Sequence, residues 1–184
     1  MWRYAIPVAL FAVIGWFLFR GLSLNPRDIP SPMVGKAAPE FSLPSLKDPN
    51  VEVGTANMQG RLSLLNVWGT WCIECRYEHP YLLELSRTTG IPIIGFNLKD
   101  DRASALAWLD RLGNPYVASA ADEDGYVAID WGIYGAPETF LIDRDGTILQ
   151  KHISPMTPEV WVRDFLPIVL EKCGRIPCPD ASEG

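Results

Sequence analysis

The stretch "WGTWCIECRYEHP", residues 68–80, holds two cysteines, Cys72 and Cys75, with two residues between them. It follows the apolar run "RLSLLNVW", residues 61–68, which is typical of a short buried strand. The residues after the cysteines carry apolar side chains at helical spacing, and Gly90 is suited to end that helix. The sequence therefore predicts a strand, then the two cysteines, then a helix that begins at Cys72.

The start of a helix is a favourable place for a reactive thiol. Unpaired backbone N–H groups and the helix dipole stabilise anions there, and a thiol at such a position can have a pKa far below the usual value of about 8.5. Cys75 is expected one turn deeper in the helix and less exposed. We therefore predict that Cys72 is the nucleophile and Cys75 the resolving thiol of a redox-active pair.

Two other uses of the cysteines are open from the residues alone. The pattern C-x2-C-x3-H, formed by Cys72, Cys75 and His79, could supply three zinc ligands. A closed zinc site needs a fourth ligand, which Cys173 or Cys178 would provide only if the C-terminal end folds back. A static disulfide is the second alternative, although a bridge that closes so small a loop stabilises a fold little. We favour the redox pair over both and predict no bound metal.

Downstream of the cysteines, strand-like runs alternate with helical patterns. A buried strand is expected over residues 91–98, and Asp100 is expected to cap a helix that ends at Gly113. The final helix is expected to open at Thr157 and to be kinked or divided at Pro167. The remaining expected elements are a strand over residues 115–119 and a hairpin of residues 138–143 and 147–153 around an Asp145-Gly146 turn. This order predicts an α/β fold in which helices flank a mixed central sheet.

The N-terminal end is a separate apolar segment. Residues 4–19 carry no charge, lie between Arg3 and Arg20, and as a helix would be about 24 Å long. With its flanking apolar residues this run can span a membrane, and no good cleavage site follows it, so we expect an uncleaved signal anchor rather than a cleaved signal peptide. Closely spaced prolines follow, which favour an extended linker. The predicted division is an anchor over residues 1–24, a Pro-rich linker and domain start over 25–41, a domain over 42–174 and a tail over 175–184.

The composition indicates one globular domain of ordinary size. The chain has 184 residues, of which 48% are hydrophobic, so a packed core is expected rather than disorder. Its formal net charge is −6, and such a chain has no basic patch of the kind that nucleic acid requires. We therefore expect no nucleic-acid partner.

The region around the cysteines resembles the thioredoxin superfamily. Trp71, both cysteines and Pro80 follow the pattern W-C-x-x-C with a proline five residues after the second cysteine. The stretch "GAPETFLID", residues 135–143, is similar to the second landmark of that superfamily. The resemblance implies a thioredoxin-like fold, a cis peptide bond before Pro137 that faces the cysteines, and a free backbone at Ala136 that pairs with an extended substrate. The predicted substrate-binding residues are Trp71, Ala136, Pro137 and Glu138.

A closer resemblance is to one family within that superfamily. The phrases "LLNVWGTWC", "CRYEHPYL", "GFNLKDDR", "DWGIYGAPETFLID" and "VGKAAPEF" together resemble the cytochrome c biogenesis thioredoxins of the CcmG/DsbE type. This implies a periplasmic, single-pass protein of the bacterial inner membrane that reduces the haem-attachment cysteines of apocytochrome c, directly or through a CcmH-type thiol partner. It also implies re-reduction by a membrane electron donor of the CcdA/DsbD kind, and no cofactor besides the Cys72–Cys75 disulfide.

Three rival functions remain at this point. A general extracytoplasmic thioredoxin of the ResA/TlpA kind would serve other clients, and a metal-delivering chaperone would carry stoichiometric zinc or copper. A purely structural binding module would use the same groove without chemistry. A peroxiredoxin is excluded, because no P-x-x-x-T-x-x-C element precedes Cys72.

Acidic residues lie close to the predicted thiol pair in the sequence. Glu74 lies between the cysteines, Glu78 one turn later and Glu138 beside Pro137. Like charges disfavour a thiolate, so we expect Glu74 and Glu78 to make the couple more reducing; the alternative is that they are exposed glutamates at a helix start. Asn66 stands where related thioredoxins carry a buried acid, and Glu78 is the candidate to replace that acid as proton acceptor, which would require a pKa raised by burial.

Two cysteines near the C-terminal end depart from the family pattern. The stretch "CGRIPC" places Cys173 and Cys178 close together, and in an oxidising compartment such a pair usually forms a structural disulfide. Unpaired cysteines or a metal-binding role are the alternatives. Both histidines, His79 and His152, are expected to be structural, and Trp68 is expected to pack around the site.

Overall fold

The computed structural model describes residues 2–22 and 32–179, which belong to two separate units. The first unit contains helix α1 (Trp2–Leu22), whose segment Tyr4–Gly21 has a mean hydropathy of 1.6. This segment is not buried within the protein, and it is long and apolar enough to cross a membrane. Residues 25–31 of the predicted Pro-rich linker and the last residues of the predicted tail, 180–184, lie outside the described residues.

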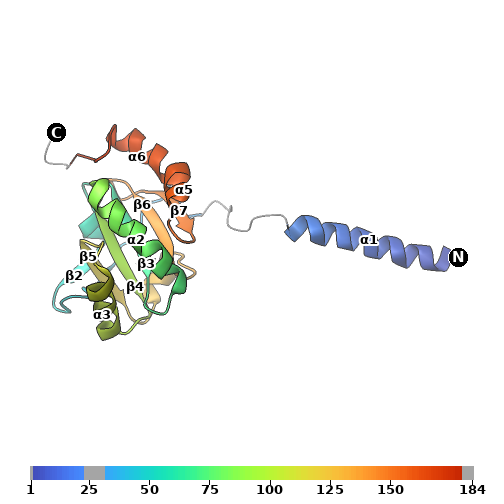
Figure 1. The fold of residues 1–184 in the computed structure, drawn as a ribbon, viewed down its shortest axis with the longest axis horizontal. Helices are drawn as coiled ribbons and strands as arrows, with labels where there is room; N and C mark the ends of the chain where they lie inside the picture. Colours follow the sequence, from blue (N-terminus) through green and yellow to red (C-terminus); the bar gives the residue numbers. More distant parts are fainter. Residues whose placement is uncertain (1, 23–31, 180–184) are drawn as a thin grey trace. The chain divides into compact units, whose positions relative to one another are not determined.

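The second unit is built on a mixed sheet. Its strands are β3 (Ser63–Trp68), β4 (Ile93–Leu98), β5 (Ala118–Asp122), β6 (Glu138–Ile142) and β7 (Ile148–Ile153). The order in this five-stranded sheet is β5-β4-β3-β6-β7 (Figure 1). β3, β4 and β5 are parallel to one another, whereas β6 runs antiparallel to both β3 and β7. The predicted mixed α/β architecture is therefore confirmed.

Helices and a small hairpin cover both faces of this sheet. The hairpin and the elements around it are β1 (Ser42–Pro44), β2 (Glu52–Gly54) and the 3-10 turn η2 (Thr55–Met58). The helices are α2 (Ile73–Thr88), α3 (Arg102–Leu112), α4 (Tyr126–Asp130), α5 (Pro158–Val160), the π-helical turn η3 (Trp161–Phe165) and α6 (Leu166–Cys173).

The two faces of β3 explain why the central strands have unbroken apolar sequences. Leu64 and Trp68 belong to a core shared with α2, α3 and the C-terminal helices, and α2 lies across this face in Figure 1. Leu65 and Val67 belong to a second core on the opposite face, shared with β2, η2 and α4. A strand that is buried on both sides has no face toward solvent, so its sequence does not alternate between apolar and polar residues. Asn66 lies on the same face of β3 as Leu64 and Trp68, which directs it toward α2.

Some predicted boundaries differ from the structure. The side chain of Asp101 caps α3, so the prediction that Asp100 caps this helix is wrong. β5 begins later than the strand predicted over residues 115–119. The final helix opens at Thr157 as predicted, and it is divided into α5, η3 and α6, with Pro167 in the first turn of α6. β1, β2, η2 and α4 were not predicted, because elements of this length show no hydrophobic period.

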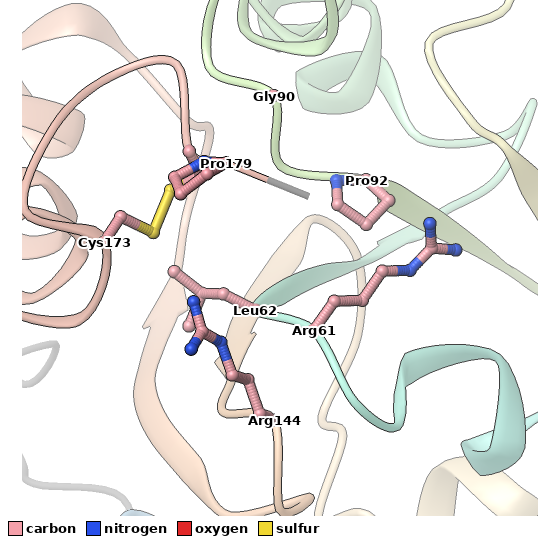
Figure 2. A pocket seen from close by; sticks show the side chains of 8 residues that line it. Arg61, Leu62, Gly90, Pro92, Arg144, Cys173 and Pro179 are labelled. Carbon is pink, nitrogen blue, oxygen red and sulfur yellow. A yellow bond between two sulfur atoms is a disulfide. The ribbon is translucent and has the colours of Figure 1, made fainter. Parts of the chain in front are cut away.

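A second disulfide joins Cys173, at the end of α6, to Cys178 (Figure 2). The backbone N–H of Cys178 donates to the carbonyl of Thr89 at 2.8 Å, which attaches the C-terminal segment to the end of α2. Gly90 has a φ of 69° there, and a Cβ at this position would lie 2.8 Å from the carbonyl oxygen of Cys178. The pair predicted to form a structural bridge therefore holds the end of α2 that is away from Cys72.

Candidate active site

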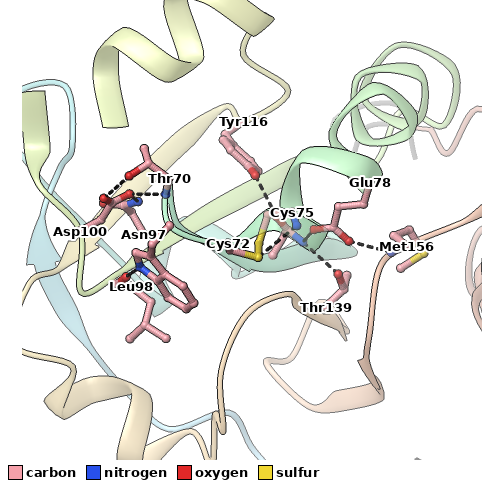
Figure 3. The surroundings of a disulfide bond; sticks show 12 residues. Thr70, Cys72, Cys75, Glu78, Asn97, Leu98, Asp100, Tyr116, Thr139 and Met156 are labelled. Carbon is pink, nitrogen blue, oxygen red and sulfur yellow. Dashed lines mark hydrogen bonds between the residues drawn. A yellow bond between two sulfur atoms is a disulfide. The ribbon is translucent and has the colours of Figure 1, made fainter. Parts of the chain in front are cut away.

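Cys72 lies at the N-terminus of α2, directly after the turn of residues 69–71 that follows β3. It forms a disulfide with Cys75 (Figure 3). Its Sγ accepts the backbone N–H of Cys75 at 3.0 Å. Cys72 is 6% exposed and Cys75 only 1%, so Cys72 carries the sulfur that a partner can reach first.

The same geometry favours a negatively charged sulfur at Cys72 once the disulfide is reduced. The N–H of Cys75 already points at this sulfur, and the first turn of a helix has N–H groups without partners in the helix itself. The helix dipole adds a partial positive charge at the same end. Both effects stabilise a thiolate, which is the form that attacks disulfides.

The turn that carries Cys72 is held in place by Asp100, which follows β4. The Asp100 carboxylate accepts the backbone N–H of Thr70 at 2.6 Å and its hydroxyl at 2.5 Å. It also accepts the side-chain amide of Asn97 at 3.0 Å (Figure 3). Because Asn97 belongs to β4, these hydrogen bonds tie the active-site turn to the neighbouring strand. This positioning role of Asp100 was not predicted from the sequence.

Trp71 packs over the turn and remains partly open to solvent. Its indole Nε1 donates to the carbonyl of Leu98 at 2.9 Å, and its side chain is 51% exposed. A Cβ on Gly69 would lie 2.5 Å from this Nε1, so the close approach of the ring requires glycine at that position. The predicted substrate-binding residue is thus fixed at one edge of its ring and accessible elsewhere.

The loop before β6 lies beside the turn that carries the cysteines. The peptide bond between Ala136 and Pro137 is cis. In the register of the sheet, Glu138 pairs with Val67, which places the start of β6 next to the end of β3. Ala136 packs against the core cluster that contains Cys72 and its partner cysteine. The sheet register therefore brings together the two landmarks that the sequence keeps far apart.

Glu138 supports this loop from inside the protein. Its Oε1 accepts the backbone N–H groups of Tyr134 at 2.7 Å and Gly135 at 3.2 Å. Its Oε2 lies 2.9 Å from Nζ of Lys151, and both side chains are 1% exposed. Lys151 also donates to the carbonyl of Gly132 at 2.7 Å. The prediction that Glu138 contacts substrate needs correction: its side chain is completely buried and its charge is paired, so it holds the loop in shape.

A buried carboxylate, Glu78, lies one turn along α2 from the second cysteine. Its Oε1 accepts the side-chain amide of Asn66 at 2.9 Å, and its Oε2 accepts the backbone N–H of Met156 at 2.6 Å (Figure 3). Asn66 also donates to the hydroxyl of Thr139 at 3.0 Å and accepts the phenol hydroxyl of Tyr116 at 2.8 Å. The acid thus receives one side-chain and one backbone hydrogen bond, and Asn66 links it to Thr139 and Tyr116.

Burial changes the acid–base chemistry of this network. It raises the pKa of Glu78 from 4.5 to about 7, although the hydrogen bonds from Met156 and Asn66 act in the opposite direction. Burial, with a further contribution from the charge of Glu78, also raises the pKa of Tyr116 well above its ordinary value. A carboxyl group that titrates near neutrality can accept or release a proton under physiological conditions. Glu78 therefore has the burial that a proton acceptor at this position requires.

The histidine of the C-x2-C-x3-H pattern packs into the core. The ring of His79 meets Trp108 edge-on with centroids 4.4 Å apart, and its Nε2 lies 2.9 Å from the carbonyl oxygen of Gly113. Burial lowers the pKa of His79. Trp68 stacks on Trp108 at 5.1 Å, as expected of a packing residue. Among residues 2–22 and 32–179, no group of three or more His, Cys, Asp or Glu side chains is arranged to hold a metal ion.

Comparison with known proteins places this site in a family. Residues 33–165 match the protein family described as Redoxin. The chain is 49% identical to the thiol:disulfide interchange protein DsbE of Allochromatium vinosum, over 95% of this chain and 97% of that protein. It is 45% identical to the protein of the same name from Pseudomonas aeruginosa, over 89% of this chain and 90% of that protein.

A solved structure shows the same fold. A secreted thiol-disulfide isomerase from Corynebacterium glutamicum superimposes with a TM-score of 0.62 and 24% identity, over 72% of this chain and 84% of that one. The predicted thioredoxin-like fold is thereby confirmed. In this chain the Cys72–Cys75 pair lies at the strand-to-helix junction that the sequence predicts. On these grounds the chain belongs to the redoxin family and, within it, to the DsbE thiol:disulfide interchange proteins.

Proposed function

We propose that this protein is a membrane-anchored reductase that keeps the haem-attachment cysteines of apocytochrome c in the dithiol form. The observation that carries the proposal is the Cys72–Cys75 disulfide at the start of α2, with the buried acid Glu78 one turn further along. The resemblance of the sequence to the CcmG/DsbE family supports cytochrome c maturation as the process. Helix α1 supports an anchor in the bacterial inner membrane, with the domain on the periplasmic side.

In the proposed reaction the reduced protein transfers two electrons to a client disulfide. The thiolate of Cys72 attacks one client sulfur, which forms a mixed disulfide and releases the other client sulfur as a thiolate. Cys75 then loses its proton, for which Glu78 is the proposed acceptor, and attacks the sulfur of Cys72. This attack breaks the bond between Cys72 and the client, whose two thiolates take up protons, so the client leaves as a dithiol and the protein keeps the Cys72–Cys75 disulfide.

The surface around Cys72 suits an extended polypeptide client. Trp71, Ile73 and Tyr77 carry exposed apolar side chains close to the cysteine in sequence, and Tyr134 is exposed beside the cis-proline loop. The backbone at Ala136 is proposed to pair with the client as an added strand, with these side chains contacting its flanks.

Glu74 is proposed to make the couple more reducing. Its side chain is exposed in the first turn of α2, between the two cysteines in sequence. A negative charge at this place opposes formation of the Cys72 thiolate. A less stabilised thiolate makes the reduced form a stronger reductant, as a reductase in an oxidising compartment requires.

The proposed partners are thiol proteins and one membrane protein. Apocytochrome c itself, or a CcmH-type thiol partner, would receive the electrons. A membrane electron donor of the CcdA/DsbD kind would reduce the Cys72–Cys75 disulfide again. Both kinds of exchange use the same sulfur, that of Cys72, so the two partners would bind in turn.

Trapping in cells tests this function. In a strain that lacks the chromosomal gene, full-length Cys75→Ala should hold its clients as mixed disulfides on Cys72, and mass spectrometry would identify them. Cys72→Ala is the matched control and should capture none. The expected clients are apocytochrome c or a CcmH-type protein, and the deletion strain should lose c-type cytochromes. Capture of oxidase assembly factors alone, with c-type cytochromes intact, would favour a general thioredoxin of the ResA/TlpA kind.

A further inference from the structure

Glu78 receives one of its two hydrogen bonds from the loop between β7 and α5, residues 154–157. The amide N–H of Met156 donates to its Oε2 at 2.6 Å, and the Met156 side chain is anchored in the core. A backbone donor can hold a carboxylate only where the backbone itself is held. Whatever fixes residues 154–157 therefore also fixes the donor to Glu78.

His152 and Ser154 fasten this loop to β7. The hydroxyl of Ser154 and Nε2 of His152 lie 2.5 Å apart and share a hydrogen bond. Nδ1 of His152 lies 3.7 Å from Oδ2 of Asp164 in η3, and its ring meets Phe165 edge-on with centroids 6.4 Å apart. His152 is thus held between the sheet and the C-terminal helical segment, and it in turn holds Ser154.

The pairing of β6 with β7 links this contact to the other side of Glu78. In the register of these strands, His152 lies directly opposite Thr139. The Thr139 hydroxyl accepts from Asn66, which also donates to Oε1 of Glu78. One donor to the Glu78 carboxylate, Asn66, thus also bonds to Thr139, and the other, Met156, lies in the loop that His152 and Ser154 fasten.

We propose that His152 and Ser154 are positioning residues that hold the Met156 amide on the Glu78 carboxylate. They act through Met156 and not on the cysteines. The inference rests on the proposed role of Glu78 as proton acceptor for Cys75, because positioning this acid affects the reaction only through that step.

The chemistry of the hydrogen bond gives the direction of the effect. The N–H of Met156 stabilises the carboxylate and lowers the pKa of Glu78, whereas burial raises it. If the loop is released, the hydrogen bond weakens and the pKa rises further. Titratable or charged groups at this network that the variants below leave unchanged include Tyr116 near Glu78, Asp164 near His152, and Arg163, which pairs with Asp164.

An NMR titration of the full-length protein in detergent micelles, with carbon-13 in the glutamate carboxyl groups, tests this inference. Ser154→Ala should raise the pKa of Glu78 by about half a unit and speed hydrogen exchange of the Met156 amide about tenfold, as expected from weakening one hydrogen bond. His152→Ala should have the same effects. His152→Gln keeps a hydrogen-bonding amide beside Ser154 and should return the Glu78 pKa and the Met156 exchange rate most of the way to their wild-type values. Ser86→Ala is the matched control, because that hydroxyl bonds within α2, and it should change neither quantity.

An unchanged titration of Glu78 in both Ser154→Ala and His152→Ala would overturn the inference. So would a lower thermal midpoint with no change in that titration, because it would assign these residues a structural role alone. The proposed role of Glu78 as proton acceptor fails by a different result: Glu78→Gln would then release client from the Cys72 mixed disulfide at the wild-type rate. In that case the titration would still show whether the loop holds the acid.

Discussion

Replacing the buried acid by its amide, Glu78→Gln, should make the stability of the protein less dependent on pH. Burial raises the pKa of Glu78 from 4.5 to about 7. The group therefore ionises above pH 4.5 in the unfolded chain, whereas in the folded protein it stays protonated up to about pH 7. At about 1.4 kcal/mol for each pH unit, this interval corresponds to about 3 kcal/mol.

The sign of this contribution follows from proton release. The stability that Glu78 contributes is complete below pH 4.5 and is lost as the pH rises to about 7, because unfolding then releases a proton. Between about pH 4 and pH 8, the free energy of unfolding of the wild type should fall by about 3 kcal/mol relative to the variant. Glutamine cannot accept both hydrogen bonds, which costs about 1 kcal/mol, so at pH 8 the variant should still be more stable by about 2 kcal/mol.

Urea unfolding of the full-length proteins in one detergent, followed by tryptophan fluorescence, measures these free energies at each pH. The difference between the two proteins cancels the contribution of the other titrating groups. Glu84→Gln removes an exposed carboxylate from the same helix and is the matched control, whose curve should stay close to the wild type. If the curves of Glu78→Gln and the wild type run parallel over this pH range, the raised pKa and the role built on it are wrong.

Three further variants test other parts of the structure. Lys151→Met should lower the free energy of unfolding by about 3 kcal/mol, because it leaves the carboxylate of Glu138 buried without its cation. Adding Glu138→Gln should recover most of this loss in the same urea assay, and a double variant as unstable as Lys151→Met would contradict the pairing. Glu74→Gln should raise the reduction potential of the active-site couple in a glutathione buffer, whereas an unchanged potential would leave Glu74 as an exposed residue at a helix start. Joint replacement of Cys173 and Cys178 by serine should cost about 2 kcal/mol of stability, from the entropy of so short a loop, and leave disulfide exchange intact; lost exchange would argue against a structural role.

The central sheet could be predicted because its strands carry local signals. β3 and β4 are buried on both faces and have continuous apolar sequences, and Asp145-Gly146 marks the turn between β6 and β7. The elements that escaped prediction, such as β1 and α4, are too short to show a period. Asp100 and Asp101 are adjacent and chemically equal, so the sequence does not distinguish the residue that caps α3 from the one that holds the active-site turn.

The reactive cysteines could also be predicted, because a strand, a Cys-x-x-Cys pair and a helix follow one another along the chain. The groups that surround Glu78 and set its pKa could not be predicted. Tyr116 lies 50 residues from Asn66 and Met156 lies 78 residues from Glu78, and only the folded sheet brings them together. Similarly, the sequence places Glu138 beside a substrate-binding proline, whereas the pairing of β6 with β7 buries it against a lysine.

The reaction of the reduced full-length protein with a peptide that carries an oxidised Cys-x-x-Cys-His segment tests the central claim most directly. Samples quenched in acid at successive times would be analysed by mass spectrometry. The wild type should convert the peptide to its dithiol and acquire the Cys72–Cys75 disulfide, Cys75→Ala should accumulate a one-to-one adduct on Cys72, and Cys72→Ala should form none. An adduct on Cys75 in the wild type or in Cys72→Ala, or a wild-type protein that leaves the peptide oxidised, would contradict the assignment of Cys72 as the attacking sulfur.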